Sequence, residues 1–229
     1  MKINITKHIP AAITLILGIQ NCYSQGFVNL DFENATVKLV PQFSFYVYAS
    51  NAIPGWTAYL GANQQNIIDY DTVNLGGAGV FLEDANAPSG GGHPPIQGSY
   101  SVLLEGSSAG TPTSASIGQT GQIPQNSQSL TFFLSLNSSL QVTFDGQMIP
   151  LVQIGSTQNY EIMAGNISTF AGQTGQLLFT ALPGTEDNAG SGLLDNIEFS
   201  SMPVPEPNEI ALAALAALFL SFCRRNSLR

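Results

Sequence analysis

The side chains available for chemistry between residues 25 and 203 are almost all carboxylates. This segment holds thirteen carboxylates against one basic residue, Lys38, so its net charge is −12. It contains one histidine, His93, while the two cysteines, Cys22 and Cys223, lie outside it. A cysteine nucleophile, a thiolate metal site and a disulfide framework are therefore excluded within the segment.

The carboxylates are the remaining candidates for catalysis or cation binding. Two carboxylates can hydrolyse a glycosidic bond, but the spacing of these thirteen does not single out a pair. Asp69-x-Asp71 and Glu83-Asp84 offer oxygen ligands for cations, although a solvated acidic loop is the favoured interpretation of both. We therefore expect a protein that is not an enzyme.

The charge distribution also limits the partners. Five of the six basic residues stand near the ends of the chain, and the acidic middle cannot neutralise phosphates. Nucleic acid is therefore excluded as a partner, whereas divalent cations and neutral polymers are electrostatically compatible.

The first 24 residues are predicted to be a secretion signal. Two lysines give the positive start, and Ile9–Ile19 is an apolar stretch too short to span a membrane. Cys22 and Ser24 are small residues at the −3 and −1 positions of a cleavage site before Gln25. We expect an exported protein.

The C-terminus combines three parts in a fixed order. They are Pro205, Glu206 and Pro207, then the apolar run Ile210–Cys223, then Arg224 and Arg225. The prolines favour an extended strip that an enzyme can grip, the run rich in Ala and Leu favours a helix, and the arginines stay on the cytoplasmic side and stop transfer.

This arrangement resembles the PEP-CTERM sorting signal of Gram-negative bacteria that make exopolysaccharide. The resemblance implies recognition by a membrane-embedded exosortase and cleavage near Pro205–Pro207. The alternative is a plain terminal anchor helix after a Pro-rich linker. Either way, the tail predicts location in the cell envelope or outside the cell, with anchoring in the membrane at least until processing.

The middle of the chain alternates apolar and polar residues with period two. Leu130–Leu136 is one such strand, and Leu140–Phe144, the turn Asp145-Gly146 and Gln147–Ile154 read as a hairpin. Other predicted strands are Phe27–Phe32, Val80–Glu83, Tyr100–Glu105, Ala115–Thr120, Tyr160–Ala164, Gln176–Ala181 and Asp195–Phe199. Many short strands with Gly-rich turns predict an all-β, antiparallel, jelly-roll-like β-sandwich.

Four parts are thus predicted. They are a signal peptide at 1–24, a β-sandwich at 25–201, a Pro-rich linker with the sorting motif at 202–209, and a transmembrane helix with a basic tail at 210–229.

Short motifs at the ends and middle of the domain carry a second resemblance. They are Asn29-Leu30-Asp31-Phe32-Glu33, Pro54-Gly55-Trp56, Gln97 to Leu104, and Leu194-Asp195-Asn196-Ile197. The pattern resembles galactose-binding-like domains and carbohydrate-binding modules. In these families the opening Glu and the closing Asp often hold a structural Ca²⁺, which makes Glu33 and Asp195 candidate ligands. The alternative is that backbone N–H groups satisfy both carboxylates.

Trp56 is the single tryptophan and the candidate ligand-binding residue, because an indole can stack on a sugar ring. The alternative is a core tryptophan after the Pro-Gly turn. Tyr46, Tyr48, Tyr59 and Tyr70 could also line a binding face, but the sequence does not group them in space.

The function expected from these observations is that of a non-catalytic surface or extracellular-matrix protein associated with exopolysaccharide or biofilm. The alternative is a carbohydrate-binding module that grips a specific glycan, and a glycoside-active enzyme is the least favoured class.

Overall fold

A computed structural model describes residues 26–72, 75–85, 92–185 and 188–205. The predicted signal peptide, the residues Glu206 and Pro207, and the predicted transmembrane helix with Arg224 and Arg225 lie outside the described residues. Among the described residues, the helices are too short to cross a bilayer.

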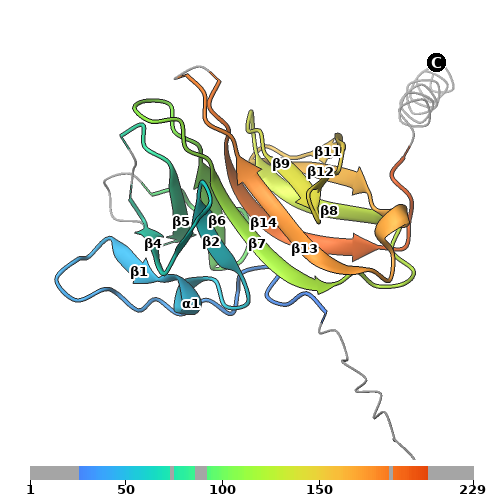
Figure 1. The fold of residues 1–229 in the computed structure, drawn as a ribbon, viewed down its shortest axis with the longest axis horizontal. Coiled ribbons are helices and arrows are strands. Elements are labelled where there is room, and N and C mark those ends of the chain that lie inside the picture. The colour runs from blue at the N-terminus through green and yellow to red at the C-terminus, as the bar shows by residue number, and fades with distance from the viewer. Residues whose placement is uncertain (1–25, 73–74, 86–91, 186–187, 206–229) are drawn as a thin grey trace, which may run out of the picture.

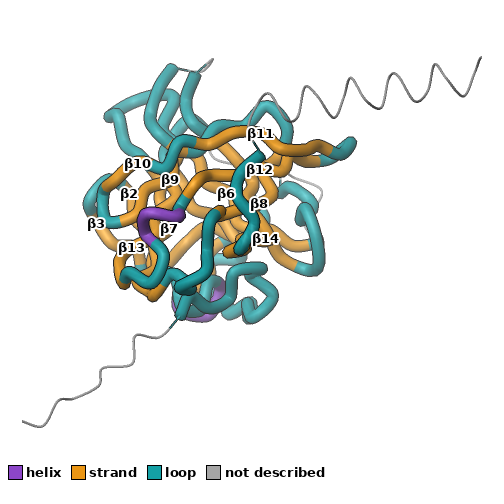
Figure 2. Tube along the Cα trace, turned by 90° about the vertical axis from the view of Figure 1, so that its right-hand side faces the viewer, coloured by secondary structure: helices purple, strands orange, loops and turns teal. Residues whose placement is uncertain are grey.

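Two β-sheets make up the described part of the chain (Figures 1 and 2). In spatial order, the eight-stranded sheet consists of β1 (Tyr46–Tyr48), β4 (Ile67–Tyr70), β5 (Gly79–Asp84), β6 (Tyr100–Glu105), β14 (Ser191–Ser200), β8 (Ser129–Ser135), β12 (Tyr160–Asn166) and β11 (Leu151–Ser156). The six-stranded sheet consists of β10 (Gln147–Met148), β9 (Gln141–Phe144), β13 (Thr174–Ala181), β7 (Ala115–Gln122), β2 (Thr57–Leu60) and β3 (Asn63–Gln65). The helices are α1 (Ala49–Ala52) and a 3₁₀ turn, η1 (Ser168–Phe170).

The predicted all-β sandwich is confirmed. Six predicted strands coincide with β5, β6, β7, β12, β13 and β14, and Leu130–Leu136 coincides with β8 to within one residue. Between the strands of the described residues, pairing is antiparallel except that β4 and β5 run parallel, with Tyr70 opposite Leu82. This parallel pair sets the ends of both strands side by side, which matters for the carboxylates that follow.

The predicted strand Phe27–Phe32 is wrong. Asn29 and Phe32 have positive φ, at 52° and 57°, which breaks an extended run. Side chains hold this segment instead of a ladder. Gln119 on β7 accepts a hydrogen bond from the Val28 N–H and donates one to the Val28 carbonyl, at 2.6 and 2.9 Å.

The hairpin at Asp145-Gly146 is confirmed, but its second arm is shorter than expected. Both turn residues have positive φ, and β10 returns beside β9 for two residues only. The Ile149 N–H still donates to the Val142 carbonyl of β9 at 2.9 Å, the pairing ends at Pro150, and β11 joins the other sheet as the partner of β12. Proline has no N–H for a ladder bond, which explains why the chain changes sheets there.

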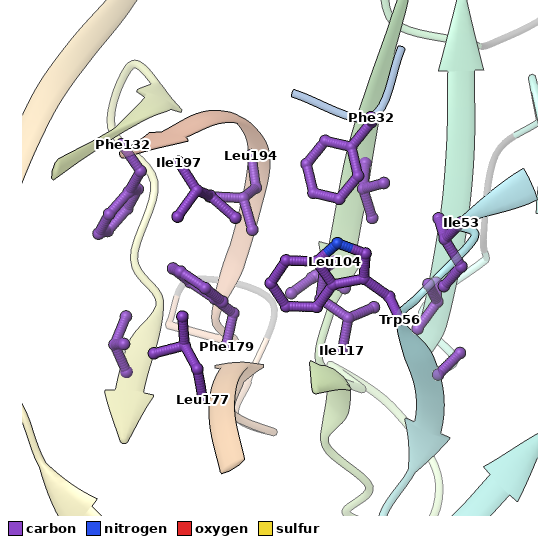
Figure 3. Close-up of a cluster of buried hydrophobic side chains, with 14 of the residues drawn as sticks. Phe32, Ile53, Trp56, Leu104, Ile117, Phe132, Leu177, Phe179, Leu194 and Ile197 are labelled. Carbon is purple, nitrogen blue, oxygen red and sulfur yellow. The ribbon is translucent and has the colours of Figure 1, made fainter. Parts of the chain in front are cut away.

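The core lies between the two sheets and is centred on aromatic side chains. Trp56 is 5% exposed and lies among Phe32, Leu104 and Ile117 (Figure 3). Its indole N–H donates to the Asn29 carbonyl at 3.0 Å, so the polar end of the ring is satisfied as well. This bond ties the non-regular N-terminal segment to the core.

Candidate functional site

The outer face of the six-stranded sheet follows from the alternation of its strands. Ala58, Ile117 and Phe179 are fully buried between the sheets, so their neighbours along each strand face outward. The outward residues are Thr57 and Tyr59 on β2, Gln64 on β3, Ser116, Gly118 and Thr120 on β7, Gln176, Leu178 and Thr180 on β13, Gln141 and Thr143 on β9, and Met148 on β10. We call this set the neutral face, because none of its side chains is charged.

Tyr59 and Gln176 meet on this face across β7. The Gln176 amide Nε2 donates to the Tyr59 hydroxyl at 3.5 Å. Gly118 lies beneath them, and a Cβ there would stand 2.9 Å from Leu178 Cδ1 and 3.2 Å from Gln176 Nε2. The missing side chain at Gly118 therefore allows the amide to reach the tyrosine.

Hydroxyl and amide groups dominate the neutral face and offer both donors and acceptors. Tyr59 adds a partly exposed aromatic ring. A hollow of about 210 Å³ lies at one end, lined by residues that include Gln141, Thr180 and Asn188. This surface suits a ligand with many hydroxyl groups and no charge.

The prediction that Trp56 stacks on a ligand does not fit the structure. Its ring is buried against Phe32 and Phe179, with ring centroids 5.9 and 6.1 Å away, and its N–H is engaged. The core alternative accounts for this residue. Trp56 contributes to a binding surface only by supporting β2, on which Tyr59 lies three residues later.

The four tyrosines considered from the sequence do not form one face. Tyr46 and Tyr48 belong to β1, where Lys38 Nζ lies 5.4 Å from the Tyr48 ring. Tyr70 donates to Asp84 on the eight-stranded sheet, and Tyr59 lies on the other sheet. Only Tyr59 belongs to the neutral face.

The structure brings Glu33 and Asp195 to the same loop before β6. Glu33 Oε1 accepts hydrogen bonds from the N–H groups of Ser99 and Tyr100, at 2.8 and 3.1 Å. Gly98 makes this approach possible, since a Cβ there would overlap the Glu33 carboxylate.

Asp195 holds the other end of the loop. Its Oδ2 accepts from the Ser101 hydroxyl at 2.7 Å and the Gln97 N–H at 3.1 Å, and its Oδ1 accepts from the Asn196 N–H. Burial raises the pKa of Asp195 to about 6, and the charge of Glu33 adds to the rise. The first and the last part of the β-sandwich thus hold one loop through the carboxylates of Glu33 and Asp195. We call this arrangement the loop clamp.

Calcium at this clamp stays a prediction. Three of the four oxygens of Glu33 and Asp195 already accept hydrogen bonds, mainly from backbone N–H groups. This bonding agrees with the alternative interpretation, in which backbone N–H groups satisfy both carboxylates. Among the residues that the structure describes, no group of three His, Cys, Asp or Glu side chains is arranged to hold a metal ion.

The expectation of a solvated acidic loop at Asp69-x-Asp71 and Glu83-Asp84 is wrong. Asp71, Glu83 and Asp84 are 4%, 0% and 4% exposed. The parallel pairing of β4 and β5 brings their C-terminal ends together, so Asp71, Glu83 and Asp84 form one buried cluster, which we call the acidic cluster.

Burial raises the pKa values of the acidic cluster. Burial is the main cause that raises the pKa of Glu83 from 4.5 to about 8, and the charges of Asp71 and Glu105 add to it. Burial likewise raises the pKa of Asp71 from 3.8 to about 6, against the hydrogen bond from the Asp84 N–H. These carboxyls therefore take up protons near neutral pH.

A nucleophile elbow was not expected from the sequence, yet Gly106-Ser107-Ser108-Ala109-Gly110 matches its Gly-x-Ser-x-Gly pattern. That elbow requires a sharp turn from a strand into a helix. Here β6 ends at Glu105, and the segment leads to β7 without a helix. The pentapeptide is a turn between strands.

His93 borders the larger of the described hollows. This groove of about 620 Å³ lies beside Leu103 and Leu193, on the outer side of the eight-stranded sheet. The His93 backbone N–H donates to Glu83 Oε2 at 2.8 Å, while the residue itself is exposed. No carboxylate is among the described residues that line the groove, so it offers no pair for glycoside hydrolysis.

No family model and no curated protein matches this sequence. One similar solved structure is the enzymatically active domain of bacteriophage CBA120 tailspike protein 4, with 15% identity, a TM-score of 0.34 and coverage of 64% of this chain. This chain spans only 19% of the length of that tailspike chain.

Two other similar solved structures align with this chain over most of their own length. A cyclase from Fischerella sp. TAU has 14% identity and a TM-score of 0.38, with 76% of this chain and 94% of that chain covered. The family 11 carbohydrate-binding module from Clostridium thermocellum, in complex with a β-1,3-1,4-mixed-linked tetrasaccharide, has 10% identity and a TM-score of 0.37, with 70% and 97% covered. Likeness at this level assigns neither a ligand nor an activity to this chain.

The raised pKa values predict how stability depends on pH when divalent cations are absent. The folded state binds protons on Asp71, Asp195 and Glu83 more tightly than the unfolded chain does. The contribution of these groups to the free energy of unfolding should therefore be fully present below about pH 4. It should be lost as the pH rises to about 6 for Asp71 and Asp195, and to about 8 for Glu83. Urea denaturation in EDTA across this range measures it. Glu83→Gln should flatten the upper part of the fall and Glu33→Gln should not; equal curves for all three proteins would contradict the prediction.

Proposed function

We propose that this chain is a non-catalytic, exported protein of the bacterial cell envelope or extracellular matrix, and that its β-sandwich binds a neutral polysaccharide through the neutral face. The observation that carries the proposal is the composition of that face. Six strands present hydroxyl, amide, aromatic and methyl groups outward without one charge, in a domain that otherwise carries a net charge of −12.

The chemistry of the neutral face matches that of a sugar chain. Sugar hydroxyls both donate and accept hydrogen bonds, as do the amides of Gln141 and Gln176 and the hydroxyls of Thr57, Thr120 and Thr143. The ring of Tyr59 gives an apolar surface for one face of a pyranose. A face without charge also avoids the cost of burying an unpaired carboxylate under a neutral ligand.

The placement of the carboxylates supports a role without catalysis. Glu83 and Asp71 are the residue types of a glycosidase pair, and Glu83 has the raised pKa that a general acid needs. Both side chains are shielded from solvent, however, so a glycosidic oxygen has no approach to them in the described structure.

The two ends of the sequence support export and sorting. The signal-like N-terminal segment and the Pro205-Glu206-Pro207 motif, with the apolar run and arginines behind it, give the resemblance to exosortase substrates. The described chain is compatible with processing there: after β14 it leaves the sheet, and Met202 is 72% exposed. Before processing, the tail would hold the protein in the membrane.

Replacing Tyr59 by alanine should weaken binding to the neutral polysaccharide by about tenfold or more, because the ring provides the stacking surface. Affinity electrophoresis against a panel of neutral polysaccharides measures this. Binding should also change little between low salt and about 1 M salt, because no charge lies on the face.

Phe43→Ala is the matched control, because Phe43 is an exposed aromatic residue outside the six-stranded sheet, 49% exposed. It should bind as the unaltered chain does. Equal loss in both variants, or binding that salt abolishes, would show that the neutral face is not the binding surface.

Deletion of Pro205–Pro207 should leave the β-sandwich folded and block processing, because the prolines form the strip that the processing enzyme grips. Intact mass of the protein from the native envelope and medium checks this. The unaltered chain should begin at Gln25 and end near Pro205–Pro207, and the deletion variant should retain its C-terminal apolar run. If the unaltered protein also retains Ile210–Arg229, the chain is a tail-anchored protein and the sorting proposal fails.

A further inference from the structure

The acidic cluster lies where the C-terminal ends of β4 and β5 meet. Its outermost members, Asp71 and Asp84, are 13 residues apart in the sequence. Asp71 follows β4 and Glu83 and Asp84 end β5, and the parallel register that sets Tyr70 opposite Leu82 makes Asp71 and Glu83 the next pair. The Asp84 N–H donates to Asp71 Oδ1 at 2.9 Å, which fixes the Asp71 carboxyl against β5. The Tyr70 hydroxyl donates to Asp84 Oδ2 at 2.7 Å.

Two carboxyl oxygens in the cluster are buried without a partner. Glu83 Oε2 accepts from the His93 N–H, but Glu83 Oε1 accepts no hydrogen bond, and neither does Asp71 Oδ2. The two carboxyls lie close to each other, since the charge of Asp71 adds to the rise in the pKa of Glu83 that burial causes. A buried acceptor without a donor is destabilising, and more so when it is charged, so the arrangement calls for a positive partner.

No side chain of the described residues supplies that partner. Lys38 is the single lysine or arginine between residues 26 and 205, and its ammonium lies over the Tyr48 ring. Around Glu83, the facing groups are Asp71 from β4, Ser101 and Glu105 from β6, and the His93 backbone from the covering loop. All the titratable side chains among these are acidic.

We propose that the facing carboxyls of Asp71 and Glu83 form a buried binding site for a divalent cation of the Ca²⁺ class. The two oxygens without a hydrogen-bond partner, Asp71 Oδ2 and Glu83 Oε1, are its protein side-chain ligands. This site is separate from the loop clamp of Glu33 and Asp195, and it does not depend on polysaccharide binding.

The chemistry of the ligands selects calcium over other metals. Carboxylate oxygens are hard ligands, and the described cluster contains no thiolate or imidazole that would favour zinc. Two facing carboxyls do not form the rigid octahedron that Mg²⁺ requires. Ca²⁺ accepts six to eight oxygens in flexible geometry, so main-chain oxygens and water complete its shell.

Calorimetric titration of the full chain with CaCl₂ after removal of metal by EDTA tests the site. At about pH 7.5 the unaltered chain should bind Ca²⁺ at this site, and Glu83→Gln should weaken that binding by at least about tenfold.

Thermal unfolding gives a second readout. At a Ca²⁺ concentration about 100-fold above Kd, the Tm of the unaltered chain should rise by about 5–10 °C. In EDTA, Glu83→Gln should be at least as stable as the unaltered chain, because it replaces an acceptor oxygen that has no partner with a donor group of similar shape. Calcium should then add little to its Tm.

Glu33→Gln is the matched control, since it removes a carboxylate from the loop clamp and leaves the acidic cluster intact. It should keep the calcium site. If Glu83→Gln does not fold, Asp71→Asn takes its place. Absence of calcium stabilisation in the unaltered chain, or equal calcium affinity in the unaltered chain and the cluster variants, overturns the proposal.

Discussion

The scarcity of positive charge is the constraint on which the arrangement of this domain depends. With one lysine between residues 26 and 205, carboxylates cannot be neutralised by salt bridges. Backbone N–H groups take that place. Glu33 and Asp195 accept from the loop before β6, and Asp145 Oδ1 accepts from the Gln176 N–H beside the β9–β10 turn at 2.8 Å. Hydrogen bonds to charged acceptors are about twice as strong as those between neutral groups, so these carboxylates define the loops that they hold.

The same constraint separates the two sheets chemically. Asp69, Glu83, Glu105 and Asp195 all belong to the eight-stranded sheet, where burial raises each pKa. The outer face of the six-stranded sheet carries amides and hydroxyls. The eight-stranded sheet therefore has buried carboxyls whose negative charge only protons or cations can neutralise. The six-stranded sheet presents a surface suited to uncharged hydroxyl-rich polymers. The proposed polysaccharide face and the proposed cation site follow from this division.

The sequence predicted the fold well where period-two alternation is strong, as at β6, β8 and β13. It failed at Phe27–Phe32, because the Gln119 side chain replaces strand pairing there and no local pattern reveals a partner 91 residues away. The short strands β1 to β4 were missed for a similar reason, since three or four residues carry too little alternation.

The candidate sites show the same difference between residues that short sequence motifs reveal and residues whose surroundings depend on strand pairing. The resemblance to galactose-binding-like domains and carbohydrate-binding modules implied Glu33 and Asp195, and the structure places them at one loop. The sequence could not show that Asp71 and Glu83 would be buried, because their burial depends on a parallel register between β4 and β5. Likewise, Trp56 attracted attention by its residue type, whereas Tyr59 depends on the sheet partners that place Gln176 beside it. A Gly at 118 opposite a Gln at 176 becomes a signal only when the pairing of β7 and β13 is known.

The central claim is that the neutral face binds an uncharged polysaccharide. The most direct measurement is backbone amide NMR during titration with neutral oligosaccharides, such as cello-, xylo- and manno-oligomers. The account predicts that shift changes cluster on β2, β7, β13 and β9, around Tyr59 and Gln176. Changes confined to the eight-stranded sheet or to the groove beside His93, or no change with any neutral oligosaccharide in the panel, would contradict it.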